Sequence, residues 1–473
     1  MSSTGRGRWM SGSRHYCHYP WGSPETALVV CCDREELGRG IAGSRLSREV
    51  LPRLAAARHE IVHACPFSRR PRIIRAMTAR IDRWQSCFRL VTSRTRTESN
   101  AVKNSLIRST GYWVPDNVIS NDELVASYNA WATRFNTEHA AAIAAGEVEE
   151  VPLSSSEFIK GASGIERRHV YEKSGILDID AMTPRIPPRA IDEVSTQAEF
   201  ALKSVRIALD KAGYDGSDID GVIVASSAQQ RNFPAVACEI QEAIGATGFS
   251  FDMTMACASA LYGLHMANGM IRSGQARRIL VCSPELMTCI NVHSRREVHF
   301  IFGDASAAMI VEADDGKPGG WDVIGTHAEN KWSSALRSDY GFINIAERTV
   351  DPDFAPHLDQ DGHRVFKDVV GFAPQVARRM MEGIDLAPAD VRRTWLHQAN
   401  IRMVDMIAKR ILDRDRTDDN APAILHEYGN TSSSSVVMNF EMHSDDMAVG
   451  ETGVMCAFGA GYGVGAAAVR KRP

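Results

Sequence analysis

From residue 104 onward, apolar and polar positions follow the pattern of an α/β protein. A helix is expected after Ser120, because Glu123 follows this capping serine by three positions, and it is expected to run through Ala145. Strand-like segments alternate with further helical segments, which favours a layered α/β architecture. The expected strands are 105–112, which runs into a glycine turn, 221–226, 279–283, 307–312 and 394–396, and further expected helices are 195–212 and 261–273.

The first hundred residues lack this periodicity and differ in composition. They hold 18 Arg, no Lys, 8 acidic residues and 5 of the 10 cysteines. The cluster His15–His18, with Cys31 and Cys32, suggests a metal site, but no ligand pair recurs at zinc-finger spacing. The arginine excess is also typical of a transit peptide, although the segment is long for one. We interpret residues 1–103 as an extension that is disordered or stems from a start codon assigned too far upstream, and we assign it no function.

Composition narrows the possible functions. The formal net charge of −4 argues against a nucleic-acid-binding protein. No apolar run approaches the roughly 18 residues of a membrane span, so neither nucleic acid nor a membrane is an expected partner. Ten cysteines without a CxxC pair are typical of free thiols in a reducing compartment. We therefore expect a cytoplasmic protein that needs neither a metal nor another cofactor.

One cysteine is distinguished by its neighbours. Cys257 follows a short strand that ends near Met255, and small residues occupy positions 256 and 258–260. Apolar residues at 261, 264, 266 and 270 then predict one face of a helix. At a helix N-terminus, free N–H groups and the helix dipole stabilise a thiolate, and small neighbours let a substrate carbonyl approach. The alternative is a buried structural cysteine.

Two further motifs carry polar side chains that suit the same chemistry. The run His397–Asn400 follows an apolar strand, and the glycine-bearing turn Tyr428–Ser433 precedes a helix of small residues. Each alone has a structural alternative, because a histidine after a strand is more often structural and an asparagine in such a turn is usually a turn former. Together, Cys257, His397 and Asn430 supply a nucleophile and two neutral hydrogen-bond donors.

In this order and spacing, these motifs resemble the ketoacyl-acyl-carrier-protein synthase III family of the thiolase superfamily. The resemblance also includes Phe300-Ile-Phe-Gly-Asp-Ala-Ser-Ala-Ala and Ala457-Phe-Gly-Ala-Gly-Tyr, and it covers roughly residues 104–470. It implies a thiolase-like α/β fold in which two similar βαβαβαββ halves stack in five layers. We place the half that carries the cysteine at 104–315 and the half that carries the histidine and asparagine at 316–473.

The resemblance implies a decarboxylative Claisen condensation in fatty acid biosynthesis by a homodimer. Cys257 would accept the acyl group of a primer thioester, and malonyl-acyl carrier protein (malonyl-ACP) would lose carbon dioxide and attack the acyl-enzyme to give 3-ketoacyl-ACP. His397 and Asn430 would hydrogen-bond the malonyl thioester oxygen, where negative charge develops. The backbone N–H groups of Cys257 and Gly461 would form the oxyanion hole.

Five further positions are candidates for substrate or carrier binding. Arg402, Lys409 and Arg410 follow Asn400 on a helix, and residues 402 and 409 are two turns apart and share a face. Such a face suits an acidic carrier protein, although a solvated helix face is the alternative. Phe233 matches a loop residue that reaches the neighbouring subunit's acyl pocket in the family, and a core phenylalanine is the alternative.

Two departures from the family concern the primer. Where the family's coenzyme A clamp has a Trp and an Arg, this sequence has Phe158 and Ala162. The helical region 129–151 is also longer than in members that use short primers. We hypothesise a divergent subgroup that takes medium-chain primers such as octanoyl-CoA.

Other functions remain open from the sequence. A thiolase needs a second catalytic cysteine, and Cys456 stands one residue out of register, which on a strand turns the side chain to the opposite face. In plant-type polyketide synthases the histidine is usually followed by Pro-Gly-Gly and the glycine loop contains Gly-Pro-Gly, but here His397 is followed by Gln-Ala-Asn and the loop lacks Gly-Pro-Gly. No glutamate matches that of a hydroxymethylglutaryl-CoA synthase. Another polyketide-type or long-chain head-to-head condensing enzyme remains an alternative. A non-catalytic acyl-binding subunit is disfavoured because all three reactive residues are retained.

Overall fold

The computed structural model describes residues 16–17, 30–31, 104–347 and 358–473. The predicted extension 1–103 therefore lies almost wholly outside the described residues, and its interpretation stays a prediction. Within it, strands β1 (Tyr16–Cys17) and β2 (Val30–Cys31) pair antiparallel. Residues 101–473 form a separate unit.

A nine-stranded mixed sheet organises this unit in the order β13-β14-β15-β10-β3-β9-β8-β6-β7. The strands β13, β14, β15 and β10 form one group, and β3, β9, β8, β6 and β7 form the other. The two groups meet where Trp321 and Asp322 of β10 pair with Ile107 and Leu106 of β3. The connection between β9 and β10 falls near residue 315, where we divide the chain into halves, and this division stays a prediction. The strands are β3 (Ser105–Trp113), β6 (Gly221–Ala225), β7 (Phe249–Met253), β8 (Arg278–Glu285), β9 (Ala305–Ala313), β10 (Trp321–Asn330), β13 (Val391–Leu396), β14 (Thr452–Gly459) and β15 (Gly463–Lys471).

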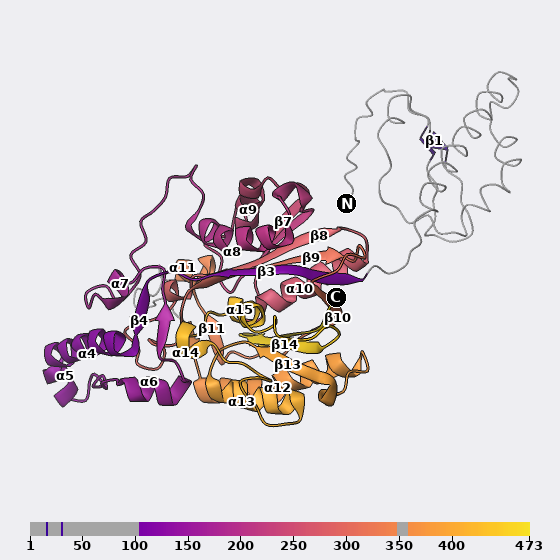
Figure 1. Ribbon diagram of the computed structural model, residues 1–473. Helices are drawn as coiled ribbons and strands as arrows, with labels where there is room; N and C mark the ends of the chain where they lie inside the picture. The colour runs from indigo at the N-terminus through magenta and orange to yellow at the C-terminus, as the bar shows by residue number, and fades with distance from the viewer. Residues whose placement is uncertain (1–15, 18–29, 32–103, 348–357) are drawn as a thin grey trace, which may run out of the picture. The chain divides into compact units, whose positions relative to one another are not determined.

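Helices cover both groups of strands, so that α and β layers alternate through five levels (Figure 1). Helices α8 and α9 cover one outer face, α12 and α13 cover the other, and α10 and α15 lie between the strands (Figure 1). These layers are the ones that the resemblance implies. The helices are α8 (Thr196–Ala212), α9 (Val236–Ile244), α10 (Ser259–Arg272), α12 (Gly362–Glu382), α13 (Ile401–Leu412) and α15 (Ser434–Met442).

Alternation along the strands creates separate cores on their two faces. Val222 of β6 packs in the cluster beneath α8 and α9, whereas its neighbour Ile223 packs in the central cluster with α10 and α15. In β14, Met455 joins the central cluster and Val454 joins the cluster beneath α12 and α13. Successive strand side chains point to opposite faces, so apolar strands buried on both sides can hold three layers of helices together.

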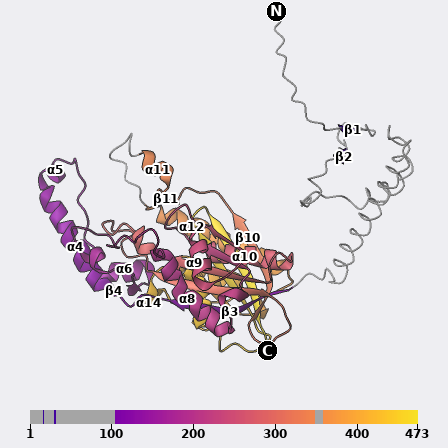
Figure 2. The same ribbon diagram turned by 90° about the horizontal axis from the view of Figure 1, so that it is seen from above.

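A smaller group of elements extends from one end of the sheets, where α4 and α5 are farthest out in both views (Figures 1 and 2). The predicted capping box is confirmed, because the Ser120 side chain accepts from the Glu123 N–H and Glu123 bonds back to the Ser120 N–H. The helix does not run unbroken through Ala145, however. It ends at Glu138. There, Nδ1 of the His139 ring lies 2.8 Å from the Phe135 carbonyl oxygen, and a second helix follows. The elements are β4 (Val118–Ser120), α4 (Asn121–Glu138), α5 (Ala140–Ala144), α6 (Ser156–Ser163), β5 (Arg167–His169) and α7 (Ser174–Leu177).

The expected strands and helices of the layered region are confirmed within a few residues of their predicted ends. Two details are wrong. Gly111 lies inside β3 rather than in a turn, and an added Cβ there would stand 2.6 Å from the Ser204 carbonyl, so α8 packs directly on this strand. Met266 is 45% exposed and lies off the buried face of α10, because spacings of two residues rotate away from a helical stripe.

The remaining elements are short. Among the described residues, no helix combines the length and the apolar character that crossing a membrane requires. The short elements are β11 (Leu336–Ser338), α11 (Phe342–Glu347), β12 (Leu358–Gln360), α14 (Leu425–Tyr428) and the 3₁₀ helices η2 (Gly216–Asp218), η3 (Met287–Cys289) and η4 (Pro388–Asp390).

Candidate active site

Cys257 lies in a sharp turn between β7 and α10. The residue before it, Ala256, has φ = 46°, a left-handed conformation that is strained for a residue with a Cβ. Ser259, the first residue of α10, stabilises the turn, because its hydroxyl accepts from the Met255 N–H at 2.7 Å and donates to the Ala256 carbonyl at 2.6 Å. Cys257 itself is 9% exposed. It stands two residues before α10 begins, at the helix N-terminus as predicted.

His397 follows the last residue of β13 and is buried. Its ring packs edge-on against Phe458 of β14, with centroids 5.0 Å apart, and its Nδ1 lies 2.8 Å from the Ser435 hydroxyl. Burial lowers the pKa of His397 to about 3, so the imidazole is neutral across the physiological range. A neutral ring at this position can donate one hydrogen bond to a substrate without carrying charge.

Asn430 follows α14 and a glycine that the turn requires. Gly429 has φ = 66°, and a Cβ there would stand 3.2 Å from the Ile301 carbonyl. The Asn430 backbone is held between two residues of the facing loop, because its N–H donates to Ile301 at 2.9 Å and its carbonyl accepts from Gly303 at 3.2 Å. Its side-chain oxygen accepts from the Ser432 N–H at 2.8 Å, which leaves the amide Nδ2 as the donor for a substrate.

Ser432 links the three candidate residues, and sequence analysis did not single it out. Its hydroxyl hydrogen-bonds to the Cys257 sulfur, its N–H donates to Asn430, and its carbonyl interacts with the imidazole of His397. The backbone of Ser432 is left-handed at φ = 51°. The structure thus brings Cys257, His397 and Asn430 around one residue. A serine inside the run 432–435 gave no local signal that distinguished it from its neighbours.

The electrostatics of the sulfur differ from the sequence expectation. Burial raises the pKa of Cys257 to about 11; hydrogen bonds from Ser432 and Ser227 act against this rise, and the charge of Glu285 adds to it. A helix N-terminus contributes about 0.3–1 kcal/mol, which is less than one pKa unit at 1.36 kcal/mol per unit. The helix therefore does not outweigh burial, and the expectation of a stabilised resting thiolate is wrong.

The glycine loop between β14 and β15 approaches the nucleophile closely. A Cβ on Gly459 would stand 2.6 Å from the Cys257 nitrogen, so only glycine fits there. Gly461 lies in the turn, where its carbonyl accepts from the Ser333 N–H at 2.6 Å. Its predicted role as an oxyanion-hole donor stays a prediction. Cys456 packs in the cluster beneath α12 and α13, on the face of β14 opposite the central layer, which agrees with the argument against a thiolase.

The predicted carrier-binding residues make mostly intramolecular contacts. Asn400 caps α13 by accepting from the Arg402 N–H at 2.9 Å, and it donates to the Ala162 carbonyl at 2.6 Å. Arg402 is exposed and reaches the Gly161 carbonyl at 3.2 Å. On the same helix, Lys409 pairs with Asp415 at 2.7 Å. Their binding roles stay predictions.

Arg410, Phe233 and Phe158 have different environments. The Arg410 guanidinium donates to the Val370 carbonyl at 2.6 Å and is therefore held against α12. Phe233 is 83% exposed, so the alternative of a core phenylalanine is wrong. Phe158 is covered by the Arg296 guanidinium, which lies 3.7 Å from the ring centroid.

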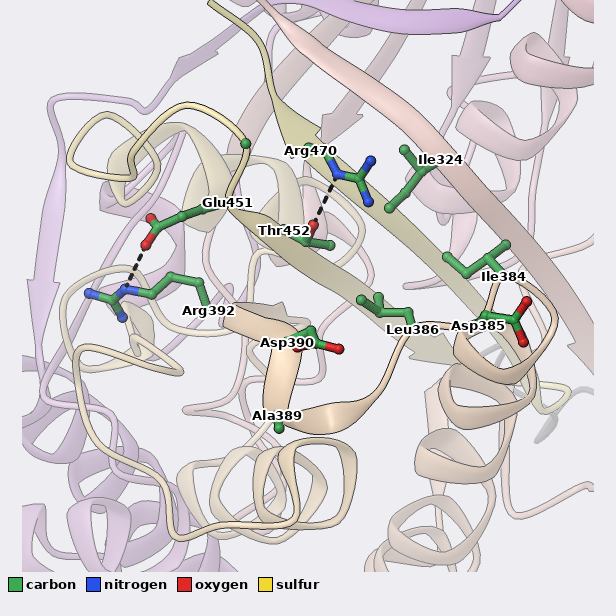
Figure 3. A pocket seen from close by; sticks show the side chains of 11 residues that line it. Ile324, Ile384, Asp385, Leu386, Ala389, Asp390, Arg392, Glu451, Thr452 and Arg470 are labelled. Carbon is green, nitrogen blue, oxygen red and sulfur yellow. Dashed lines mark hydrogen bonds and ion pairs between the residues drawn. The ribbon is translucent and has the colours of Figure 1, made fainter.

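A cavity of about 620 Å³ lies away from these residues, at the start of β14 (Figure 3). It is bordered by an ion pair between Arg392 and Glu451 at 3.7 Å and by the Arg470–Thr452 hydrogen bond (Figure 3). None of its lining residues is a candidate for catalysis, and several are charged. A cavity alone therefore does not identify the site, which is defined by the convergence of side chains around Ser432.

Comparisons with known proteins agree with the fold and with the spacing of the motifs. Residues 251–331 match the family model for 3-oxoacyl-[acyl-carrier-protein] synthase III, and residues 381–471 match the model for its C-terminal part. The chain is 42% identical over 347 residues to the β-ketodecanoyl-[acyl-carrier-protein] synthase of Pseudomonas aeruginosa, covering 73% of this chain and 99% of that protein.

Two solved structures share the fold. The 3-oxoacyl-[acyl-carrier-protein] synthase III of Aquifex aeolicus superposes with a TM-score of 0.60 at 23% identity, over 77% of this chain and 99% of that one. The priming β-ketosynthase of the R1128 polyketide pathway superposes with a TM-score of 0.62 at 24% identity, over 78% and 97%. At these identities, the likeness concerns the fold alone.

Proposed function

Because this chain belongs to the 3-oxoacyl-[acyl-carrier-protein] synthase III family, we propose that it condenses an acyl primer with malonyl-ACP to give 3-ketoacyl-ACP. The reaction is a decarboxylative Claisen condensation in fatty acid biosynthesis, and the enzyme is an acyltransferase. The observation that carries the assignment to this site is the contact of Ser432 with a thiol, an imidazole and a carboxamide.

In the first step, Cys257 attacks the carbonyl carbon of the primer thioester. A bond forms between sulfur and the acyl carbon, the bond to the carrier sulfur breaks, and the thiol proton goes to the departing thiolate. Negative charge on the tetrahedral oxygen needs two N–H donors, and we assign these to Cys257 and Gly461. The contact of Gly459 with the Cys257 nitrogen supports this assignment, because it brings the glycine loop against the same amide.

In the second step, His397 and Asn430 bind the malonyl thioester oxygen. The bond between the malonyl α-carbon and its carboxylate breaks, carbon dioxide leaves, and the electron pair of that bond forms an enolate. The enolate carbon bonds to the acyl carbon of acyl-Cys257, the bond from that carbon to sulfur breaks, and Cys257 leaves as a thiolate that takes up a proton from solvent. Donation by the imidazole needs a proton on Nε2 and hence a bare Nδ1. The Ser435 hydroxyl lies 2.8 Å from Nδ1 and donates to the Ser432 carbonyl at 2.7 Å, so it has to turn toward the ring to donate to Nδ1 in this tautomer. The neutral state of His397 suits this role, because a neutral donor stabilises the developing oxyanion without giving up its proton.

We infer a medium-chain primer. The relative at 42% identity is named for a β-ketodecanoyl product, whose ten acyl carbons include two from malonyl, so the corresponding primer has eight. The contact between Arg296 and Phe158 is relevant to the carrier of the primer, because a guanidinium that already covers the aromatic ring leaves no space between them for another planar group.

We also propose that two copies of the chain pair through β7. This strand lies at the end of the sheet order and pairs only with β6 among the described strands, so its other edge carries free N–H and C=O groups. Such an edge favours pairing with another strand. Phe233, exposed in a single copy, would then be available to the partner subunit. Light scattering of the purified protein measures the expected dimer mass.

For the acidic carrier protein, we propose the exposed face of α13. Arg402 is exposed, and Lys409 remains 65% exposed despite its ion pair with Asp415. Arg410 contributes less to this face, because its guanidinium is bonded to α12. A cytoplasmic location, where ACP and thioesters are available, is part of this proposal, and the free thiols of Cys238 and Cys289 are compatible with it.

Acyl loading followed by condensation tests the proposed function. The protein is incubated with acetyl-CoA, octanoyl-CoA or octanoyl-ACP, and the acyl adduct at Cys257 is measured by intact mass and peptide mapping. Malonyl-ACP is then added and the product is identified by mass. We expect octanoyl loading to exceed acetyl loading and to yield β-ketodecanoyl-ACP, with no adduct in C257S. Preference for acetyl would refute the medium-chain proposal, and loading without a ketoacyl product would favour an acyl-binding subunit.

A further inference from the structure

Glu285, the last residue of β8, is a buried carboxylate that the proposed mechanism does not use. Its side chain is only 1% exposed, and no basic side chain of the described region lies within ion-pair distance of it. Its partners are serines instead. The Ser227 N–H donates to its carboxylate at 3.0 Å, the Ser226 hydroxyl donates at 3.2 Å, and the Ser433 hydroxyl donates to the same group. A buried charge without a counterion is costly, and these serine hydrogen bonds are what offset that cost here.

These serines belong to segments that are far apart in the sequence. Ser226 and Ser227 follow β6, whereas Ser433 immediately precedes α15. The carboxylate therefore connects the end of an N-terminal strand to the start of a C-terminal helix. Beside this connection, the hydroxyl of Ser227 bonds to the hydroxyl of Ser432.

The two connected hydroxyls contact the nucleophile. Both Ser227 and Ser432 hydrogen-bond to the Cys257 sulfur, so the position of the sulfur's polar partners depends on the two segments that Glu285 holds. No hydrogen bond of the described residues joins the hydroxyl of Ser227 to the carboxylate of Glu285. The carboxylate therefore acts as a clamp, which holds together the two segments that carry Ser227 and Ser432. Among the residues that the structure describes, it has no hydrogen-bond path through the Ser227 hydroxyl by which it could pass a proton to the sulfur.

We propose that Glu285 is a positioning residue for Cys257, which clamps the two serine segments and, through its charge, sets how readily the thiol loses its proton. The inference rests on the proposed function only in taking Cys257 as the nucleophile. It extends that function by adding a control of thiol reactivity from outside the substrate-binding side.

The charge of Glu285 has a definite sign of effect. Burial raises the pKa of Glu285 to about 7, although serine hydrogen bonds act in the opposite direction. Once ionised, the carboxylate raises the pKa of Cys257, since two negative charges in a buried site oppose each other. Loss of the Glu285 charge therefore makes the thiolate easier to form.

Few other titratable groups face this clamp. From the β13 side, His397 is neutral at all pH values of interest, because burial lowers its pKa to about 3. From the β9 side, Asp304 precedes the residue that pairs with Glu285, and its carboxyl accepts from Thr288 at 2.6 Å. Burial raises the pKa of Asp304 to about 6, so a control for this second carboxyl is needed.

The test measures alkylation of Cys257 by iodoacetamide between pH 5.5 and 10, resolved by peptide mass spectrometry. This reaction needs no acyl substrate, so its outcome is separate from that of the condensation assay. In the native protein, the logarithm of the rate should rise with pH, flatten near pH 7 as Glu285 ionises, and rise again. In E285Q the flattened section should disappear, and the rate at pH 8–9 should increase several-fold.

Two control variants make the result specific. E312Q changes another buried carboxylate of the sheet, which is paired with Arg108 at 2.6 Å and Arg278 at 2.8 Å, and it should keep the flattened section. D304N should also keep it. A profile of E285Q that superimposes on the native profile would overturn the proposal, and so would loss of the flattened section in D304N alone. If E285Q does not fold, E285D should keep the charge but loosen the clamp, and an unchanged rate of acyl loading in that variant would likewise contradict it.

Discussion

The pH dependence of Cys257 reactivity is the most direct consequence of the site's electrostatics. A pKa of about 11 means that about 0.1% of the thiol is ionised at pH 8. An unperturbed cysteine with a pKa of about 8.5 is about one quarter ionised at that pH. Because the thiolate is the nucleophile, Cys257 should react with a small alkylating reagent about 200-fold more slowly than a free thiol at pH 8, before any steric hindrance.

The slope with pH separates this electrostatic effect from hindrance. Between pH 8 and 10.5, where Glu285 stays ionised, the alkylation rate of Cys257 should rise about tenfold per pH unit. Hindrance lowers the rate at every pH but leaves that slope unchanged. The exposed Cys238 serves as an internal reference in the same sample, because its peptide is quantified alongside.

A plateau of the Cys257 rate below pH 8.5 would refute the reasoning. It would mean that the helix N-terminus and the serine hydrogen bonds together outweigh burial, as the sequence alone suggested. It would also mean that the resting enzyme holds a thiolate. In that case the first step of catalysis would need no proton transfer to the departing thiol.

Three further predictions concern neighbouring residues. Replacing His397 or Asn430 by Ala should lower the rate of malonyl-ACP decarboxylation by about 10²–10³ while octanoyl loading changes little, and a parallel loss of loading in mass spectrometry would contradict separate roles. Gly459→Ala should reduce loading more than tenfold, because its Cβ would meet the Cys257 nitrogen at 2.6 Å, whereas Gly371→Ala, with open space at its Cβ, should load normally. As the pH is lowered from 6.5 to about 3, the free energy of unfolding should fall, because in that range His397 takes up a proton in the unfolded state and not in the folded state. Denaturant melts of H397N should show a smaller fall of the unfolding free energy over the same range.

Local pattern was sufficient for most secondary structure. The short apolar runs 221–226 and 279–283 predicted β6 and β8, and Ser120 with Glu123 predicted the start of α4, because each signal lies within a few residues. The end of α4 at Glu138 was missed, because no Gly or Pro marks it; in the structure the His139 ring contacts the Phe135 carbonyl there at 2.8 Å. Gly111 was misread as a turn former, because the helix that packs on it is distant in the chain.

What the sequence by itself determined about this protein is the α/β class, part of its strands and helices, and three candidate catalytic side chains in family order, because periodicity and motifs are local properties. Only the tertiary structure decided what surrounds the sulfur. Ser432 and Glu285 approach Cys257 from segments separated by many residues, and the burial that raises its pKa is produced by all the layers together. A pKa depends on solvent exclusion and on charges in space, and neither is encoded in the spacing of residues along the chain.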